Sequence, residues 1–215
     1  MPSPRFQLSL VLMLLIAATS ACSSVYYGTM EKLGIDKRDI LVDRVEEARS
    51  QQEDARDQFR STLDAFRDLN DFDGGELEDR YDRLKSGYED SVDEAESVSD
   101  RINSIEKVAH DLFFEWEAET AEISDPGLRS ESAQLRRDTQ SRYDGMLTAM
   151  RRAESKMPPV LTKFHDQVLF LKHNLNARAI SSLQSQMISV RSDVDALIVE
   201  MEKSIAEADA FLAEL

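Results

Sequence analysis

The amino-acid sequence predicts an all-α protein, an elongated antiparallel helical bundle or coiled coil of three to four long helices. Three observations predict this fold class. Apolar residues recur at alternating steps of four and three, which places them along one side of a helix. The 215 residues include only seven glycines and five prolines, so turns are few and the elements between them are long. No run of alternating β-branched residues bounded by turns indicates a strand.

The first helix is predicted over residues 36–70, with Asp36 as its N-cap. Its stripe of apolar and small residues keeps the four-three spacing throughout. The stripe consists of Leu41, Val45, Ala48, Gln52, Ala55, Phe59, Thr62, Phe66 and Leu69. The segment NDFDGG at residues 70–75 then ends the helix, because paired glycines interrupt helices.

The second helix is predicted over residues 76–123, which at 1.5 Å per residue makes it roughly 70 Å long. Asp73 followed by Glu76 is typical of a helix start. The stripe of this helix consists of Leu77, Tyr81, Leu84, Tyr88, Val92, Ala95, Val98, Ile102, Ile105, Ala109, Leu112, Trp116 and Ile123.

The third helix is predicted over residues 126–156. Asp125 is its expected N-cap, and Pro126 occupies the first helical position, where a missing N–H is harmless. Its stripe is weaker, with Ser132 and Thr139 at apolar positions. The stripe consists of Leu128, Leu135, Tyr143, Met146, Leu147, Met150 and Met157.

The fourth helix is predicted over residues 159–213, with one stripe from Phe164 to Leu212. Pro158-Pro159 separates it from the third helix, because proline lacks a backbone donor and disfavours helix in the preceding residue. The sequence leaves open whether these prolines make a tight reversal or only a kink. A reversal gives four antiparallel helices, whereas a kink gives three, one of them very long.

Charge is sorted along the chain. Residues 76–125 contain 17 acidic and 5 basic residues, whereas residues 126–192 contain 5 acidic and 11 basic. We expect the two segments to pack antiparallel across their short turn, with apolar burial supplying most of the stability. The alternative is a basic face for another molecule. The net charge of −16 argues against nucleic acid, because phosphate contacts need a surplus of Lys and Arg.

Residues 1–21 have the pattern of a bacterial lipoprotein signal peptide. Arg5 precedes an apolar core at residues 8–18, which is too short to span a bilayer. Ala21 lies directly before Cys22, the chain's single cysteine, as in a lipobox, although Thr19 stands where leucine is commonest.

We therefore expect cleavage before Cys22 and acylation of this cysteine by two or three chains, palmitate among them, which anchor a protein to a membrane. Residues 22–35 are then a lipidated tether. By analogy with such signals, Ser23 rather than Asp after the cysteine favours the outer membrane. The alternative is ordinary secretion with Cys22 as an unmodified thiol.

The search for catalytic motifs finds none. G-x-x-x-x-G-K is absent, so we expect no nucleotide, and His-Glu-x-x-His is absent too. Di-iron bundles place Glu three residues before His, whereas Lys107, Thr162 and Phe170 precede the three histidines here. We therefore expect a protein that is not an enzyme and that holds no cofactor and no metal.

Residues 164–175 are the most apolar and least acidic stretch of the mature chain. We expect a partner surface there, formed by Phe164, His165, Phe170 and His173. The alternative is the central core of the bundle, with two histidines at its polar edge.

Three blocks of the chain resemble a helical lipoprotein family of Gram-negative bacteria that is described only as a domain of unknown function. The blocks are residues 33–46 (LGIDKRDILVDRVE), 156–161 (KMPPVL) and 171–177 (LKHNLNA). The resemblance extends over essentially all of the mature chain. It implies a coiled-coil lipoprotein of the cell envelope, and it implies no activity and no catalytic residue.

From these patterns we expect a non-enzymatic lipoprotein on the periplasmic face of the outer membrane. It would act as a structural spacer or as an adaptor for a periplasmic protein. One alternative is a carrier of lipid or another apolar ligand. Another is an enzyme whose unrecognised site uses scattered carboxylates with His165 or His173. A homo-oligomer is also open, because coiled-coil seams pair between chains as readily as within one.

Overall fold

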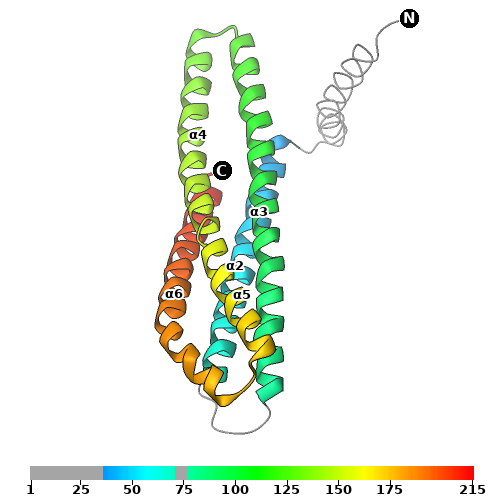
Figure 1. The fold of residues 1–215 in the computed structure, drawn as a ribbon. Coiled ribbons are helices and arrows are strands. Elements are labelled where there is room, and N and C mark those ends of the chain that lie inside the picture. Colours follow the sequence, from blue (N-terminus) through cyan, green and yellow to red (C-terminus); the bar gives the residue numbers. More distant parts are fainter. Residues whose placement is uncertain (1–35, 71–76) are drawn as a thin grey trace, which may run out of the picture. The chain divides into compact units, whose positions relative to one another are not determined.

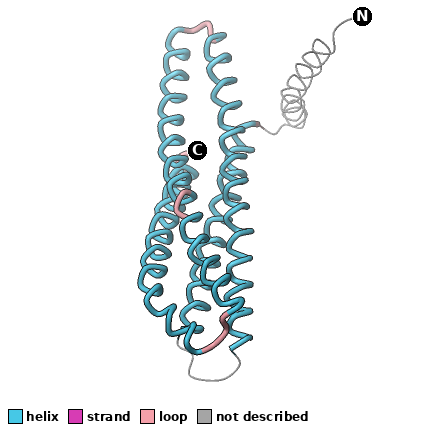
Figure 2. The backbone as a smooth tube through the Cα atoms, viewed as in Figure 1, coloured by secondary structure: helices cyan, strands magenta, loops and turns pink. Residues whose placement is uncertain are grey.

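A computed structural model of the chain describes residues 36–70 and 77–215, and every element within these ranges is an α-helix (Figure 2). The helices are α2 (Lys37–Asn70), α3 (Leu77–Glu122), α4 (Pro126–Glu154), α5 (Met157–His173) and α6 (Ala177–Ala213). The predicted all-α fold is therefore confirmed. The predicted signal peptide, Cys22, the tether and most of the turn at residues 70–75 lie outside the described residues.

The chain forms two compact units, Met1–Leu41 and Val42–Leu215, and α2 runs through their boundary. Of the first unit, the structure describes the beginning of α2. There the carbonyl oxygen of Asp36 accepts a hydrogen bond from the amide of Ile40 at 3.1 Å. Asp36 thus occupies the N-cap position that its sequence predicts. The second unit contains the rest of α2 and all of α3 to α6.

Cross-helix contacts within the second unit show that α2 and α3 run antiparallel. Glu47 of α2 pairs with Arg101 of α3 at 2.7 Å, whereas Thr62 lies 2.9 Å from Ser91. Residue numbers therefore rise along α2 as they fall along α3.

The predicted pairing of the acidic helix with the basic segment after it is confirmed. Glu106 of α3 pairs with Arg151 of α4 at 2.6 Å, and Glu117 pairs with Arg136 at 3.2 Å. The two helices are thus antiparallel and joined by the turn at Asp125. The side chain of Asp125 accepts a hydrogen bond from the amide of Leu128 at 2.9 Å, which confirms it as the N-cap of α4.

α6 completes the bundle by packing against α4 and α2. Arg142 and Arg152 of α4 pair with Glu214 and Glu200 of α6, at 2.6 Å and 3.3 Å. Arg49 of α2 pairs with Asp209 of α6 at 2.5 Å. The basic segment therefore has two acidic neighbours, α3 and α6, where the sequence analysis named only the first.

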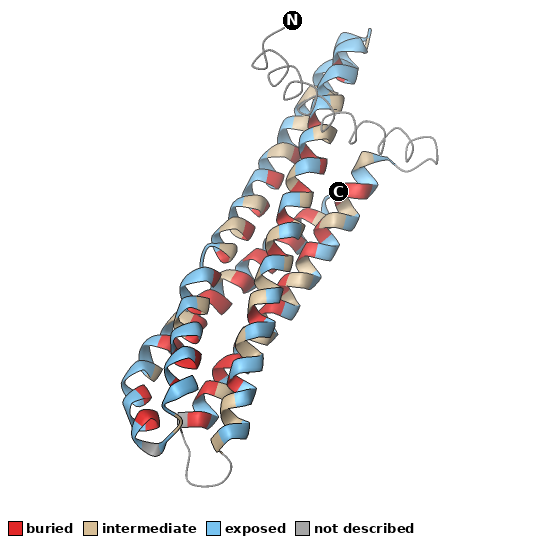
Figure 3. Ribbon diagram, turned by 45° about the vertical axis from the view of Figure 1, so that its right-hand side comes forward, coloured by how far each residue is buried: buried red, intermediate tan, exposed pale blue. Residues whose placement is uncertain are grey.

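The stripe predicted for α2 is the side that the bundle buries, as Figure 3 shows by colour. Phe59 on this stripe stacks with Phe164 of α5, with ring centroids 6.4 Å apart. Burial of such side chains is the main source of stability, at about 25 cal/mol per Å² of apolar surface. The buried members in the second unit are Val45, Ala48, Gln52, Ala55, Phe59, Thr62, Phe66 and Leu69.

Pro158 and Pro159 make a kink and not a reversal. Ser155 and Lys156 keep right-handed helical backbone angles, φ −62° and ψ −16° and then φ −86° and ψ −18°. The prolines lie in the first turn of α5, where backbone N–H groups have no partner within the helix. α3 packs along both α4 and α5. α4 and α5 therefore act as one arm of the bundle, with a kink between them (Figure 1).

The prediction of a single helix over residues 159–213 is wrong, because the chain reverses between α5 and α6. Asn174, with φ −131° and ψ 41°, ends α5. Asn176 is extended, and its Oδ1 accepts hydrogen bonds from the amides of Arg178 and Ala179 at 3.1 Å each. These bonds cap the beginning of α6. The bundle therefore has four arms, which are α2, α3, α4 with α5, and α6.

α2 and α3 approach each other closely at Gly87. Its carbonyl oxygen accepts hydrogen bonds from Thr62 Oγ1 at 2.8 Å, Ser91 Oγ at 2.7 Å and Gln58 Nε2 at 3.1 Å. A Cβ atom added to Gly87 would lie 2.9 Å from Thr62 Oγ1. The approach thus requires a residue without a side chain on α3.

The methyl group added by Gly87→Ala overpacks the contact with Thr62, which costs about 1–3 kcal/mol. Alanine favours a helix over glycine by about 1 kcal/mol, so we predict that the variant lowers the free energy of unfolding by up to about 2 kcal/mol. The matched control is Gly145→Ala on α4, where a Cβ meets nothing within 4 Å, so the variant should be more stable than the parent. Urea denaturation followed by circular dichroism measures both. Equal stabilities of the two variants would contradict the close approach.

We also predict a pH-dependent effect at Glu94 of α3. Burial raises its pKa above the ordinary value of 4.5, and Asp54 of α2 raises it further, while a hydrogen bond from Gln51 opposes both. A carboxyl whose pKa is raised by folding destabilises the folded state when ionised, so its contribution worsens as the pH rises through its titration range. Glu94→Gln should therefore raise the free energy of unfolding at pH 7, with a gain that disappears as the pH falls below about 4.5.

The control for this prediction has the opposite sign. The pKa of Asp57 on α2 is lowered, chiefly by the hydrogen bond from Arg56, so its ionised form stabilises the fold. Asp57→Asn should lower stability at pH 7, and the loss should disappear in acid. Denaturation curves between about pH 2.5 and pH 7, a range that extends below the ordinary pKa of both carboxyls, test both variants. A Glu94→Gln effect that does not change with pH would exclude titration as its cause.

Candidate interaction surfaces

A groove of about 270 Å³ lies between α5 and α6, next to the reversal that joins them. The two helices meet at an angle set by the short Asn174–Asn176 connection, and α6 starts from its asparagine cap. The groove is lined by Asp166, Gln167 and Phe170 of α5 and by Ser182, Leu183 and Gln186 of α6.

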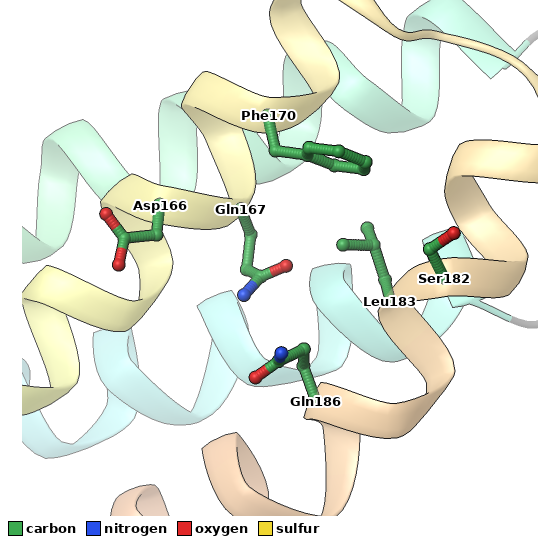
Figure 4. A pocket seen from close by; sticks show the side chains of 6 residues that line it. All are labelled: Asp166, Gln167, Phe170, Ser182, Leu183 and Gln186. Carbon is green, nitrogen blue, oxygen red and sulfur yellow. The ribbon is translucent and has the colours of Figure 1, made fainter.

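The groove is lined by apolar and by polar side chains (Figure 4). The Phe170 ring and the Leu183 side chain lie on either side of the space between the helices, while the Asp166 carboxylate points away from it. Gln167 is only 7% exposed, and its Oε1 has no hydrogen-bond partner among the described residues. The groove thus combines apolar walls with a buried acceptor.

The structure separates the four side chains that the sequence predicts as a partner surface. Phe164 does not belong to it, because its side chain is fully buried against Phe59. His165 is exposed, and its ring lies 5.6 Å from that of Tyr88 on α3. Phe170 is 41% exposed and lines the groove. His173 is exposed at the end of α5, and neither it nor His165 lines the groove.

Gln167 is the functional candidate that sequence reasoning missed. It follows Phe164 by three residues and precedes Leu171 by four, so all three lie on one face of α5. Phe164 and Leu171 are both buried. A polar residue on an apolar face was the signal, and it was overlooked because glutamine is usually exposed.

A second surface lies at the joined ends of α3 and α4. α6 ends beside Arg142 and Tyr143 of α4, where Arg142 pairs with Glu214 and the Tyr143 ring lies 6.3 Å from that of Phe211. Figure 1 shows α3 and α4 continuing beyond this point as a two-helix hairpin. We call this part, residues 112–141, the hairpin end.

Polar side chains hold the two helices of the hairpin end together. Trp116 Nε1 donates a hydrogen bond to Ser132 Oγ at 3.0 Å, and Thr120 Oγ1 lies 2.8 Å from the same hydroxyl. Arg136 reaches Glu117 across the pair at 3.2 Å. Ser132 thus forms a small polar layer where the sequence pattern predicts an apolar stripe.

Ion pairs fix the base of the hairpin end. Arg151 of α4 donates to both carboxylate oxygens of Glu106, at 3.2 Å and 2.6 Å, and also to Asn103 and Glu154. The hydrogen bonds to Glu106 are the main reason that the pKa of Arg151 is raised. Burial raises the pKa of the neighbouring Tyr143 to about 12, so both groups keep their protons at neutral pH.

Two leucines of the predicted α4 stripe are exposed at the hairpin end. Leu128 and Leu135 are 60% and 53% exposed, although the stripe predicts burial. They precede Arg142 by two steps of seven residues, so all three lie on one side of α4. Arg142 is itself exposed and pairs with Glu214 next to the end of α6, so this side of α4 borders α6 further along the helix. The leucines are exposed because α6 ends before it reaches them.

The described part of the chain contains no helix long and apolar enough to cross a membrane. Within the same residues, no group of three or more His, Cys, Asp or Glu side chains is arranged to hold a metal ion.

Comparison with known proteins finds one family. A model described as "Protein of unknown function (DUF2959)" matches residues 26–215, which include every described helix. No curated protein and no solved structure matches the chain.

Proposed function

The chain belongs to the DUF2959 family, and we propose that it is a lipid-anchored protein of the cell envelope that acts as an adaptor and not as an enzyme. The family match begins at residue 26, after the leader and Cys22. This is consistent with an export signal that precedes the family's helical domain. The proposed location is the periplasmic face of the outer membrane, where two or three acyl chains on Cys22 would anchor the protein stably.

The observation that carries the adaptor role is the side of α4 left uncovered at the hairpin end. Leu128 and Leu135 lie on the side of α4 that borders α6 lower down, and they are more than half exposed. An amphipathic helix laid along this side would bury both leucines. The hairpin end is thus an incomplete bundle that a partner helix can complete.

The charges of the bundle indicate the chemistry of that helix. α6 meets α4 through Glu200 and Glu214, which pair with Arg152 and Arg142. Beyond Arg142 the exposed charged residues next to the two leucines on this side of α4 are Glu131 and Asp138, at helical spacings of three and four residues. We therefore propose, as the partner, an amphipathic helix of a periplasmic protein with basic residues beside its apolar side.

The two other functions have less support. The groove between α5 and α6 measures about 270 Å³, below the roughly 300–1,000 Å³ of pockets for drug-sized ligands, so it favours no acyl chain. His165 and His173 lie outside this groove, so the groove gives no support to a histidine-based active site.

The anchor predicts that cells incorporate an alkyne-labelled fatty acid into the wild-type chain and that Cys22→Ser abolishes the label. The variant should also leave the membrane fraction, since no acyl chain holds it there. Ser24→Ala is the matched control and should keep both the label and the membrane association. A wild-type chain without label would overturn the anchor.

The adaptor predicts that a photocrosslinking residue at position 131, exposed between the two leucines, captures one defined envelope protein in cells. Leu128→Glu with Leu135→Glu should reduce this product at least tenfold, because two charged carboxylates would replace the apolar contact. Both residues are exposed, so the helical circular dichroism should not change.

The matched control is Leu169→Glu on α5, which is also 50% exposed but far along the chain from the hairpin end. It should leave the crosslinked product unchanged. An equal product from the double variant, or none from the parent, would contradict the proposed surface.

A further inference from the structure

We propose that the groove between α5 and α6 is a binding site for an aromatic ring that bears one hydrogen-bond donor, the chemistry of a tyrosine or tryptophan side chain. The inference deepens the proposed function, since it gives the adaptor a second contact. It rests on that function only in assigning the aromatic ring to a partner protein.

The first observation is the orphaned acceptor. Gln167 is 93% buried, since 7% of it is exposed, and its Oε1 accepts no hydrogen bond from any described residue. Figure 4 shows this oxygen turned toward Leu183, beneath the Phe170 ring. Native proteins satisfy almost all buried polar atoms, so this oxygen lacks a donor, which a ligand in the groove can supply once the surrounding side chains move enough to open access to it.

The second observation is the shape of the walls. Phe170 from α5 and Leu183 from α6 lie on either side of the space above Gln167 (Figure 4). Phe170 is 41% exposed, so part of its ring is accessible to a ligand. A flat ring placed between them would pack against the phenyl group and bring its donor to the amide oxygen.

The polar groups of the groove select a neutral donor. Ser182 and Gln186 are uncharged, and the only carboxylate of the lining, that of Asp166, points away from the space. The lining contains no basic side chain that would pair with a phosphate, and it directs no carboxylate into the space to pair with an ammonium. A phenol hydroxyl or an indole N–H supplies a donor without a charge to desolvate.

The volume selects a single ring. The groove measures about 270 Å³, somewhat less than the pockets that hold drug-sized molecules. One substituted ring fits this space.

The test compares p-cresol, the side-chain analogue of tyrosine, with toluene, which has the same shape without the donor. Both are titrated into the full-length chain while the amide resonances of Gln167, Phe170 and Leu183 are followed by NMR. We expect p-cresol to bind about three- to tenfold more tightly than toluene, the gain that one hydrogen bond usually gives.

Gln167→Leu removes the acceptor and keeps nearly the same volume. It should reduce the preference for p-cresol to less than twofold while toluene binds as before. Gln184→Leu makes the same change on an exposed position of α6 outside the groove lining, and it should keep the parent's preference. Urea denaturation checks that both variants fold.

A further arm distinguishes the source of the ring. If the peptide acetyl-Gly-Tyr-Gly-amide binds at the same residues and its Phe analogue binds more weakly, the ring belongs to a partner protein. If p-cresol binds and the peptide does not, the site takes a free aromatic molecule. Both results support the site.

Two results would overturn the proposal. The first is equal binding of p-cresol and toluene to the parent chain, and the second is no change in the amide resonances of the groove residues. Neither result bears on crosslinking at position 131. The failure of this proposal and the failure of the adaptor role are therefore distinguishable.

Discussion

The apolar stripe of α3 is the longest surface that the bundle has to cover, and the other helices are arranged around this requirement. α3 has 46 residues, and α4 and α5 together have as many, with 29 and 17. The prolines at the α4–α5 junction keep these two helices on one course, so that together they cover the whole of α3. α6 has only 37 residues, and it therefore leaves the far end of α4 uncovered.

Polar residues inside the bundle determine how closely and in which register the helices meet. Thr62 and Ser91 satisfy each other and the carbonyl of Gly87, which permits the close approach of α2 and α3. Gln52 is fully buried on the same stripe of α2, and both polar atoms of its side chain lack a partner among the described residues. Such a residue costs stability, and in coiled coils a single buried polar residue at a stripe position fixes the register of pairing.

Much of the fold could be predicted from the sequence because it depends on local chemistry. The stripe of α2, the Asp125 cap and the pairing of acidic α3 with basic α4 each follow from residue types at a fixed spacing. The reversal at Asn174–Asn176 could not be predicted from spacing, because the apolar rhythm continues on both sides of it without glycine or proline. The available signal was asparagine, which is a favoured N-cap residue.

The same reversal explains why the candidate surfaces were only partly predicted. Periodicity identifies the side of a helix that is apolar, but it does not say whether another helix is long enough to cover that side. The chain turns back after residue 173, so the 37 residues of α6 reach Arg142 and stop there, seven residues short of Leu135. A single long helix over residues 159–213 would have had no facing helix beside Phe170 and hence no groove. Both surfaces therefore depend on where one asparagine-capped turn divides the last apolar stripe.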